Sequence, residues 1–196
     1  MTPTISQAVG VNDQVDVRPV GPVVFSQAEI ADAVRRLAAD ISRDYQDDPP
    51  VVVGVLPGGI FLLADLVRAL SLPVEVDVIA ISRFGPPEET GGVVHIQRDV
   101  EAEIEGRPVL LVEDIVDTGL TVHHLLGTLI PRQPASVRVA ALLGRPNRRL
   151  IRVPLHYVGF EAPEDFLVGY GLGHEGRFRQ LPYIARYPTD PPEAVD

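Results

Sequence analysis

Two adjacent carboxylates at the end of an apolar run are the residues of this sequence best suited to chemistry. Glu113 and Asp114 directly follow Val109–Val112, four apolar residues that predict a buried strand. In an open parallel sheet, ligands bind where strands end and helices begin, and an acidic residue there accepts hydrogen bonds from sugar hydroxyls. The type and position of these two carboxylates therefore indicate a ribose site.

A short loop after the carboxylates has the residues that hold a phosphate group. Asp117, Thr118, Gly119, Leu120 and Thr121 lead into a predicted helix. The start of a helix offers unpaired backbone N–H groups and a positive dipole end, which both favour an anion. Gly119 lets the backbone approach that anion, and the threonine hydroxyls donate to it. A solvated acidic turn would account for the carboxylates but not for the ordered Thr-Gly-x-Thr.

The elements that must position these residues alternate between strand and helix. This alternation predicts an α/β fold, with a mainly parallel twisted sheet flanked by helices. Ser26 and Glu29 form a capping-box pattern at the start of one amphipathic helix. The predicted strands are 51–56, 76–81, 109–112, 137–143 and 155–159, and the predicted helices are 26–41 and 60–72.

The chain is expected to form one domain over residues 21–186, with flexible ends at 1–20 and 187–196. Residues 83–103 are polar, contain Gly and Pro, and include a possible hairpin at 93–97. A segment of this length in a single domain is usually a functional lid or a disordered loop.

Composition excludes several classes of function. The chain has no Cys, which rules out disulfides, thiolate metal sites and cysteine nucleophiles. A net charge of −10 argues against sequence-independent nucleic-acid binding, which depends on Lys and Arg. There is no signal-peptide pattern and no apolar run that could span a bilayer. A cytoplasmic enzyme without nucleic-acid or membrane partners is therefore expected.

Three segments together resemble the phosphoribosyltransferases, enzymes that use 5-phosphoribosyl-1-pyrophosphate (PRPP). The run 109–121 resembles the PRPP motif of this family. The resemblance implies that a second strand end is the pyrophosphate-binding loop, formed by Leu56, Pro57, Gly58 and Gly59. It further implies a mobile active-site lid, which opens with Ser82, Arg83, Phe84 and Gly85.

The C-terminal segment resembles, more narrowly, the base-binding part of hypoxanthine-guanine phosphoribosyltransferases. The match covers residues 23–184 and implies a type I phosphoribosyltransferase fold with a small C-terminal hood and a long flexible loop. Phe166 would then stack on a purine, and Leu167 would offer its backbone to the edge of the base. Ile115 and Arg145 would complete the base site, and Arg179 would contact pyrophosphate.

The resemblance also implies a reaction. The 5-phosphoribosyl group of PRPP passes to a purine base, which gives a nucleoside 5′-monophosphate and pyrophosphate. Asp117 would be the general base. Glu113 and Asp114 would hold the ribose hydroxyls directly or through Mg²⁺, the expected cofactor. Relatives form dimers and tetramers, so a homodimer or homotetramer is expected.

Two positions depart from the family. Arg145 stands where the family has a Lys that contacts the base, and Gly173 stands where it has an Asp that helps to bind Mg²⁺. His174, Glu175 or water could replace that carboxylate, or a second metal could bind weakly. These departures leave open a different purine-like base, such as xanthine or a 7-deazapurine, and a non-catalytic sensor of PRPP.

The loop 56–59 carries a further hypothesis. Relatives have a cis peptide between Leu and Lys there, and this chain has Pro57 in place of the Lys. Since a cis bond costs far less before proline than before other residues, we expect the Leu56–Pro57 bond to be cis.

Overall fold

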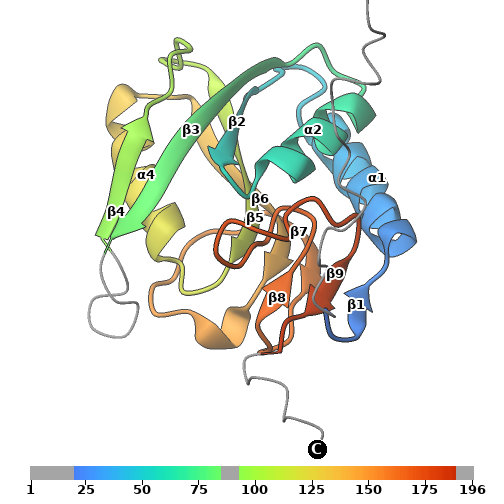
Figure 1. Ribbon diagram of the computed structural model, residues 1–196. Coiled ribbons are helices and arrows are strands. Elements are labelled where there is room, and N and C mark those ends of the chain that lie inside the picture. The colour runs from blue at the N-terminus through green and yellow to red at the C-terminus, as the bar shows by residue number, and fades with distance from the viewer. Residues whose placement is uncertain (1–19, 85–92, 189–196) are drawn as a thin grey trace, which may run out of the picture.

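Two β-sheets of different size organise the residues that the computed structural model describes, 20–84 and 93–188 (Figure 1). The larger sheet has the order β4-β3-β2-β5-β6-β7. All its neighbouring strands are parallel except β4, which runs antiparallel to β3 at one edge. Its strands are β2 (Val51–Leu56), β3 (Glu75–Phe84), β4 (Val93–Arg98), β5 (Pro108–Val116), β6 (Ser136–Gly144) and β7 (Tyr157–Glu161).

The smaller sheet joins segments from both ends of the chain. Its antiparallel strands lie in the order β1 (Val23–Phe25), β9 (Ile184–Arg186) and β8 (Leu167–Val168). Residues 162–187 and β1 are called the hood below, because they lie over one end of the larger sheet (Figure 1). The predicted fold class is confirmed, including the small C-terminal hood.

Helices cover both faces of the larger sheet. Helices α1 (Gln27–Asp44) and α2 (Ile60–Ala69) pack on one face, and α4 (Leu120–Leu129) packs on the other (Figure 1). Two short 3₁₀ turns, Ile130–Arg132 and Pro146–Arg148, follow α4 and β6. No helix of the described residues is long and apolar enough to cross a membrane.

The strands that run between these layers are apolar on both sides. In β5, Leu110 and Val112 belong to the core beneath α1 and α2, whereas Val109 and Leu111 belong to the core beneath α4. Since successive side chains of a strand point to opposite faces, a continuous apolar run is what a sheet covered on both faces requires. This explains why 109–112 could be identified as a strand.

The capping box at the start of α1 is confirmed. The Ser26 hydroxyl accepts from the backbone N–H of Glu29 at 3.3 Å, and the Glu29 carboxylate accepts from the Ser26 N–H at 2.8 Å. Arg36 then fastens α1 to β7 by donating to the carbonyl of Gly159 at 2.7 Å. Ser26 therefore fixes the helix start where the sequence pattern places it.

Several predicted boundaries were wrong. Strand β3 continues to Phe84 instead of ending at residue 81, because its last residues pair with β4, so Ser82, Arg83 and Phe84 are strand residues instead of the start of a loop. The possible hairpin at 93–97 is instead the single strand β4, which pairs antiparallel with β3. Gly85 lies outside the described residues. Helix α2 ends at Ala69, three residues before the predicted end.

Asp77 of β3 binds the segment that follows β4 through backbone hydrogen bonds. Its carboxylate accepts from the backbone N–H groups of Glu101 at 2.7 Å and Ala102 at 2.9 Å, and its side chain is 9% exposed. Burial opposes ionisation of this carboxyl. The hydrogen bonds from Ala102, Val78 and Glu101, with the charge of Arg98, outweigh burial and lower the pKa of Asp77 below its ordinary value.

Asp77→Asn should lower the free energy of unfolding by about 2 kcal/mol at pH 7, because these bonds are made to a charged acceptor. A carboxyl whose pKa is lowered by folding stabilises the protein above its unfolded-state pKa, and this contribution is lost as the pH falls. The difference from wild type should therefore shrink at pH 3. Urea unfolding at pH 7 and pH 3 measures this difference in the free energy of unfolding. The control is Asp47→Asn, a substitution at an exposed carboxylate. An equal difference at both pH values would contradict the assignment.

Candidate active site

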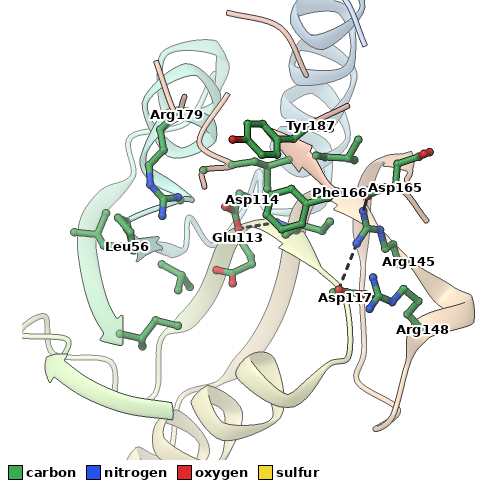
Figure 2. A pocket seen from close by; sticks show the side chains of 18 of the residues that line it. Leu56, Glu113, Asp114, Asp117, Arg145, Arg148, Asp165, Phe166, Arg179 and Tyr187 are labelled. Carbon is green, nitrogen blue, oxygen red and sulfur yellow. Dashed lines mark hydrogen bonds and ion pairs between the residues drawn. The ribbon is translucent and has the colours of Figure 1, made fainter. Parts of the chain in front are cut away.

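A cleft opens where strands β2 and β5 part. Strand β2 pairs with β3 as far as Leu56, but with β5 only as far as Gly54 opposite Val112. Strand β5 continues beside β6 to Val116. The order of the chain reverses between β2 and β5, and such a switch point at the carboxyl ends of parallel strands is where α/β sheets bind ligands. A cavity of about 830 Å³ lies here (Figure 2).

The cavity brings together residues from strand ends, the segment after β6 and the hood. Strand β2 and the following loop contribute residues 55–58, β3 contributes Ile81, and the end of β5 contributes residues 113–115 and Asp117. The remaining described residues that line it are Arg145, Arg148, Glu164, Asp165, Phe166, Leu167, Leu172, Gly173, Arg179 and Tyr187. Predicted ribose, pyrophosphate and base residues thus share one cavity.

The two carboxylates lie within β5 and not after it, because β5 extends beyond residue 112 beside β6. Glu113 is 5% exposed, and the Asp114 carboxylate accepts from the backbone N–H of Ile115 at 2.7 Å. Figure 2 shows both carboxylates to the left of the Phe166 ring. Their side chains leave alternate faces of the strand, yet both line the cavity.

The loop 56–59 packs directly against Asp114. The Leu56–Pro57 peptide bond is cis, as hypothesised. A Cβ atom added to Gly58 would lie 1.8 Å from Oδ2 of Asp114, so only glycine leaves room for the carboxylate. Gly59 begins α2, and its N–H donates to the carbonyl of Val55 at 2.8 Å instead of facing the cavity.

Glu113 and Asp114 are the carboxylates suited to a magnesium ion. The described residues contain no group of three or more His, Cys, Asp or Glu side chains that could hold a metal by themselves. Mg²⁺ is commonly bound by one or two carboxylates together with substrate phosphates and water. The donor set therefore fits a metal that arrives with a phosphorylated substrate.

Asp117 lies between two guanidinium groups. Oδ2 of Asp117 is 3.4 Å from Nη1 of Arg145, and Oδ1 is 3.5 Å from Nε of Arg148 (Figure 2). Arg148 also approaches Glu164 of the hood at 3.7 Å. The carboxylate is thus oriented in the cavity by cations from the segment that follows β6.

Arg145 is buried and fastened to the hood. Its Nε donates to the carbonyl of Pro163 at 2.8 Å, and its Nη2 donates to the carbonyl of Asp165. With the contact to Asp117, these bonds use three of its five N–H groups. Arg145 therefore joins the hood to Asp117 and keeps only part of its donor capacity for a ligand.

The loop 117–121, the predicted phosphate loop, lies beside the cavity around a small recess. Gly119, with a φ of 86°, caps α4, which begins at Leu120, so Leu120 and Thr121 lie in the first turn of the helix instead of in the loop before it. Thr118 and Thr121 line this recess of about 10 Å³ together with Ile115 and Asp117, which also line the large cavity. The carbonyl of Thr118 accepts from Leu150 at 2.9 Å and from Ile151 at 3.2 Å, so the segment after β6 holds the loop.

The hood supplies the aromatic wall and one cation. Phe166 is 42% exposed although it lines the cavity, and Leu167 is buried beside it. Arg179 donates to the carbonyl of Gly171. A Cβ atom on Gly173 would lie 2.9 Å from Cγ of Arg179, so the small residue lets Arg179 pack closely. These contacts fix Arg179 at the edge of the cavity.

The sequence patterns missed three kinds of residue in the cavity. Arg148 lies shortly after the end of a predicted strand, in a segment with several arginines. This position at a strand end is the one sequence signal that could have marked Arg148 as a site residue. Glu164 and Asp165 precede Phe166 in a segment without periodicity. Tyr187 was assigned to the tail, but it lines the cavity because β9 ends one residue before it. Glu175, a suggested replacement for the missing carboxylate, is exposed and outside the lining residues.

Comparison with known families decides the assignment. The model of the phosphoribosyl transferase domain matches residues 24–174, which include both strand ends and the phosphate loop. The chain belongs to the phosphoribosyltransferase family. This confirms the resemblance seen in the PRPP motif.

Relatives within this family point to one branch of it. Hypoxanthine phosphoribosyltransferase of Haemophilus influenzae is 40% identical over 84% of this chain and 93% of its own length. Hypoxanthine-guanine phosphoribosyltransferase of Mycobacterium avium is 43% identical over 80% of this chain and 74% of its own length. The crystal structure of a Bacillus anthracis hypoxanthine-guanine phosphoribosyltransferase, 35% identical, has a TM-score of 0.83 and covers 87% of this chain and 100% of that one.

Gly58→Ala should weaken PRPP binding by on the order of 100-fold, because the added methyl group must displace the Asp114 carboxylate. Isothermal titration with PRPP and Mg²⁺ measures the effect. Gly127→Ala is the matched control, since a Cβ atom there meets nothing within 4 Å and alanine favours the helix. An unchanged affinity in Gly58→Ala would show that the position of Asp114 does not matter for PRPP.

Proposed function

We propose that this phosphoribosyltransferase transfers the 5-phosphoribosyl group of PRPP to a purine base, hypoxanthine or guanine, and releases pyrophosphate. The observation that carries the proposal is the parting of β2 and β5, with Glu113, Asp114, Asp117 and the exposed ring of Phe166 around one cavity. The names of the relatives give the purine bases as the expected acceptors. The product is the nucleoside 5′-monophosphate.

The ribose phosphate half of PRPP is assigned to β5 and the loop after it. Glu113 and Asp114 accept from the ribose hydroxyls, while Thr118, Gly119, Leu120 and Thr121 surround the 5′-phosphate through backbone N–H groups and threonine hydroxyls. This division is supported by the position of residues 118–121, which directly follow the cavity residue Asp117 and include the start of α4.

The pyrophosphate half is assigned to the loop 56–59 and to Arg179. The backbone N–H group of Gly58 and the guanidinium of Arg179 suit an anion with several oxygens. Gly59 is expected to shape this loop without donating to the anion, because its N–H already donates to the Val55 carbonyl. Mg²⁺, when bound to PRPP beside Glu113 and Asp114, would neutralise charge on the leaving pyrophosphate. Arg179 adds a fixed positive charge at the same end of the cavity.

Asp117 is assigned as the general base. As the bond from ribose C1 to pyrophosphate breaks, a purine imidazole nitrogen forms the new bond to C1, and the carboxylate accepts the proton that the purine loses. The sugar carries positive charge in the transition state, as in glycoside hydrolysis. Arg145 and Arg148, at 3.4 Å and 3.5 Å, orient Asp117 for this transfer.

The base is assigned to the space between Ile115 and the hood. Phe166 offers a flat apolar face for stacking, and Leu167 offers its backbone to the edge of the purine. Arg145 keeps N–H groups that can donate to a 6-oxo group. Ser82, Arg83, Phe84 and Gly85 stay proposed as part of an active-site lid. Location in the cytoplasm, and self-association as a homodimer or homotetramer, also remain proposals.

Asp117→Asn should lower kcat at least 100-fold, because the amide keeps the shape of the side chain but cannot take up the proton. Pyrophosphate release from PRPP, Mg²⁺ and hypoxanthine measures the rate. The affinity for PRPP should stay within a factor of about three, since the ribose and phosphate contacts are retained. A variant with near-normal turnover would remove Asp117 from the role of base.

The choice of base is tested by a panel of hypoxanthine, guanine, xanthine, adenine and 7-deazapurines. We expect hypoxanthine or guanine to be turned over fastest, because the free N–H groups of Arg145 suit a 6-oxo group. Turnover of another base alone would mean that the arginine has changed the specificity. Tight PRPP binding without turnover of any base would favour a sensor of PRPP over an enzyme.

A further inference from the structure

An aromatic cluster at the end of the hood extends the wall formed by Phe166. The ring of Tyr187 lies 6.0 Å from that of Phe166, 4.6 Å from that of His174 and 5.5 Å from that of Phe178, measured between centroids. His174 also meets Phe166 edge-on, at 5.4 Å and 85°. Tyr187 is thus the ring that contacts each of the other three.

The backbone holds Tyr187 beside Phe166. Strand β9 pairs with β8 so that Arg186 lies opposite Leu167. The next residue along, Tyr187, donates its N–H to the carbonyl of Phe166 at 2.8 Å. The register of the small sheet therefore fixes the relative positions of the two rings.

Tyr187 and Phe166 form an aromatic corner in a cavity that aliphatic and charged side chains also line. Their ring planes meet at 65°, and both side chains line the cavity (Figure 2). A flat base that stacks on the exposed face of Phe166 would have one edge directed toward Tyr187. Contact of this kind between aromatic rings adds affinity beyond the burial of apolar area.

We infer that Tyr187 is a further base-binding residue, one that neither the PRPP motif nor the predicted base site includes. The inference rests on the proposed function, because the ligand of the corner is the purine. It assigns Tyr187 to the base half of the site alone, since, among the described residues, its ring contacts and its backbone hydrogen bond are made to the hood.

The test compares two ligands that differ by the base. Inosine 5′-monophosphate contains ribose, phosphate and purine, whereas ribose 5-phosphate lacks the purine. Tyr187→Ala should raise the Kd for inosine 5′-monophosphate about tenfold and leave the Kd for ribose 5-phosphate within about twofold. Tyr187→Phe should bind both ligands as wild type does, because it keeps the ring. Isothermal titration on the full-length protein measures the Kd of each ligand for the wild type and for both variants.

Tyr183→Ala is the matched control, an aromatic deletion next to β9 at a residue outside the cavity lining. Equal weakening of both ligands in Tyr187→Ala would indicate a structural role and overturn the inference, as would an unchanged Kd for inosine 5′-monophosphate. If Tyr187→Ala does not fold, Tyr187→Leu keeps apolar volume without a ring and should weaken inosine 5′-monophosphate alone. A wild-type protein that binds neither ligand would overturn the proposed function and this assignment together.

Discussion

The site depends on one constraint, the early end of the pairing between β2 and β5. Four residue pairs hold the two strands together, from Val51 opposite Val109 to Gly54 opposite Val112. Beyond these pairs, β2 still pairs with β3 and β5 still pairs with β6, but β2 and β5 no longer pair with each other. Residues 55–58, 113–115 and Asp117 therefore line a space that no strand fills. The cavity follows from the topology, and the chemistry follows from which residues occupy the two separated strand ends.

Charged side chains of both signs line this space. The net charge of the chain is −10, and the cavity holds Arg145, Arg148 and Arg179 together with five acidic residues, which are Glu113, Asp114, Asp117, Glu164 and Asp165. An anionic substrate meets local cations and backbone N–H groups, so net charge has little bearing on its affinity. Arg145 has a second effect, because its bonds to the carbonyls of Pro163 and Asp165 tie the hood to Asp117. Arg145 thus holds the hood, which includes Phe166, at a fixed position relative to Asp117, the proposed general base.

The sequence allowed prediction of the parts whose signal is local. Continuous apolar runs identify the strands, and Ser26 and Glu29 identify a helix start. The ordered loop after β5 indicates that a helix follows, and α4 does begin there. Strand ends were misplaced where pairing decides them. Residues 82–84 extend β3 because β4 lies beside them, and residues 113–116 extend β5 because β6 does.

Contacts between distant segments had no local signal. The short strands of the hood carry no useful periodicity, so the place of Tyr187 depends on the register of β9 against β8, and a polar C-terminal composition suggested a tail instead. Arg145 was recognised as a candidate through the family resemblance. Its bonds to two hood carbonyls depend on how the segment after β6 folds back, which no spacing rule describes.

The small sheet has a consequence for how the protein is made. Strand β9 lies between β1 and β8, so the central strand of the hood is the last one to leave the ribosome, while its first strand is among the earliest. The residues assigned to ribose and phosphate lie in strands and loops that can be complete by the end of β6. During synthesis, the ribose-phosphate half can therefore take shape well before the half that holds the base. Full capacity to select a base arises only when the two ends of the chain come together.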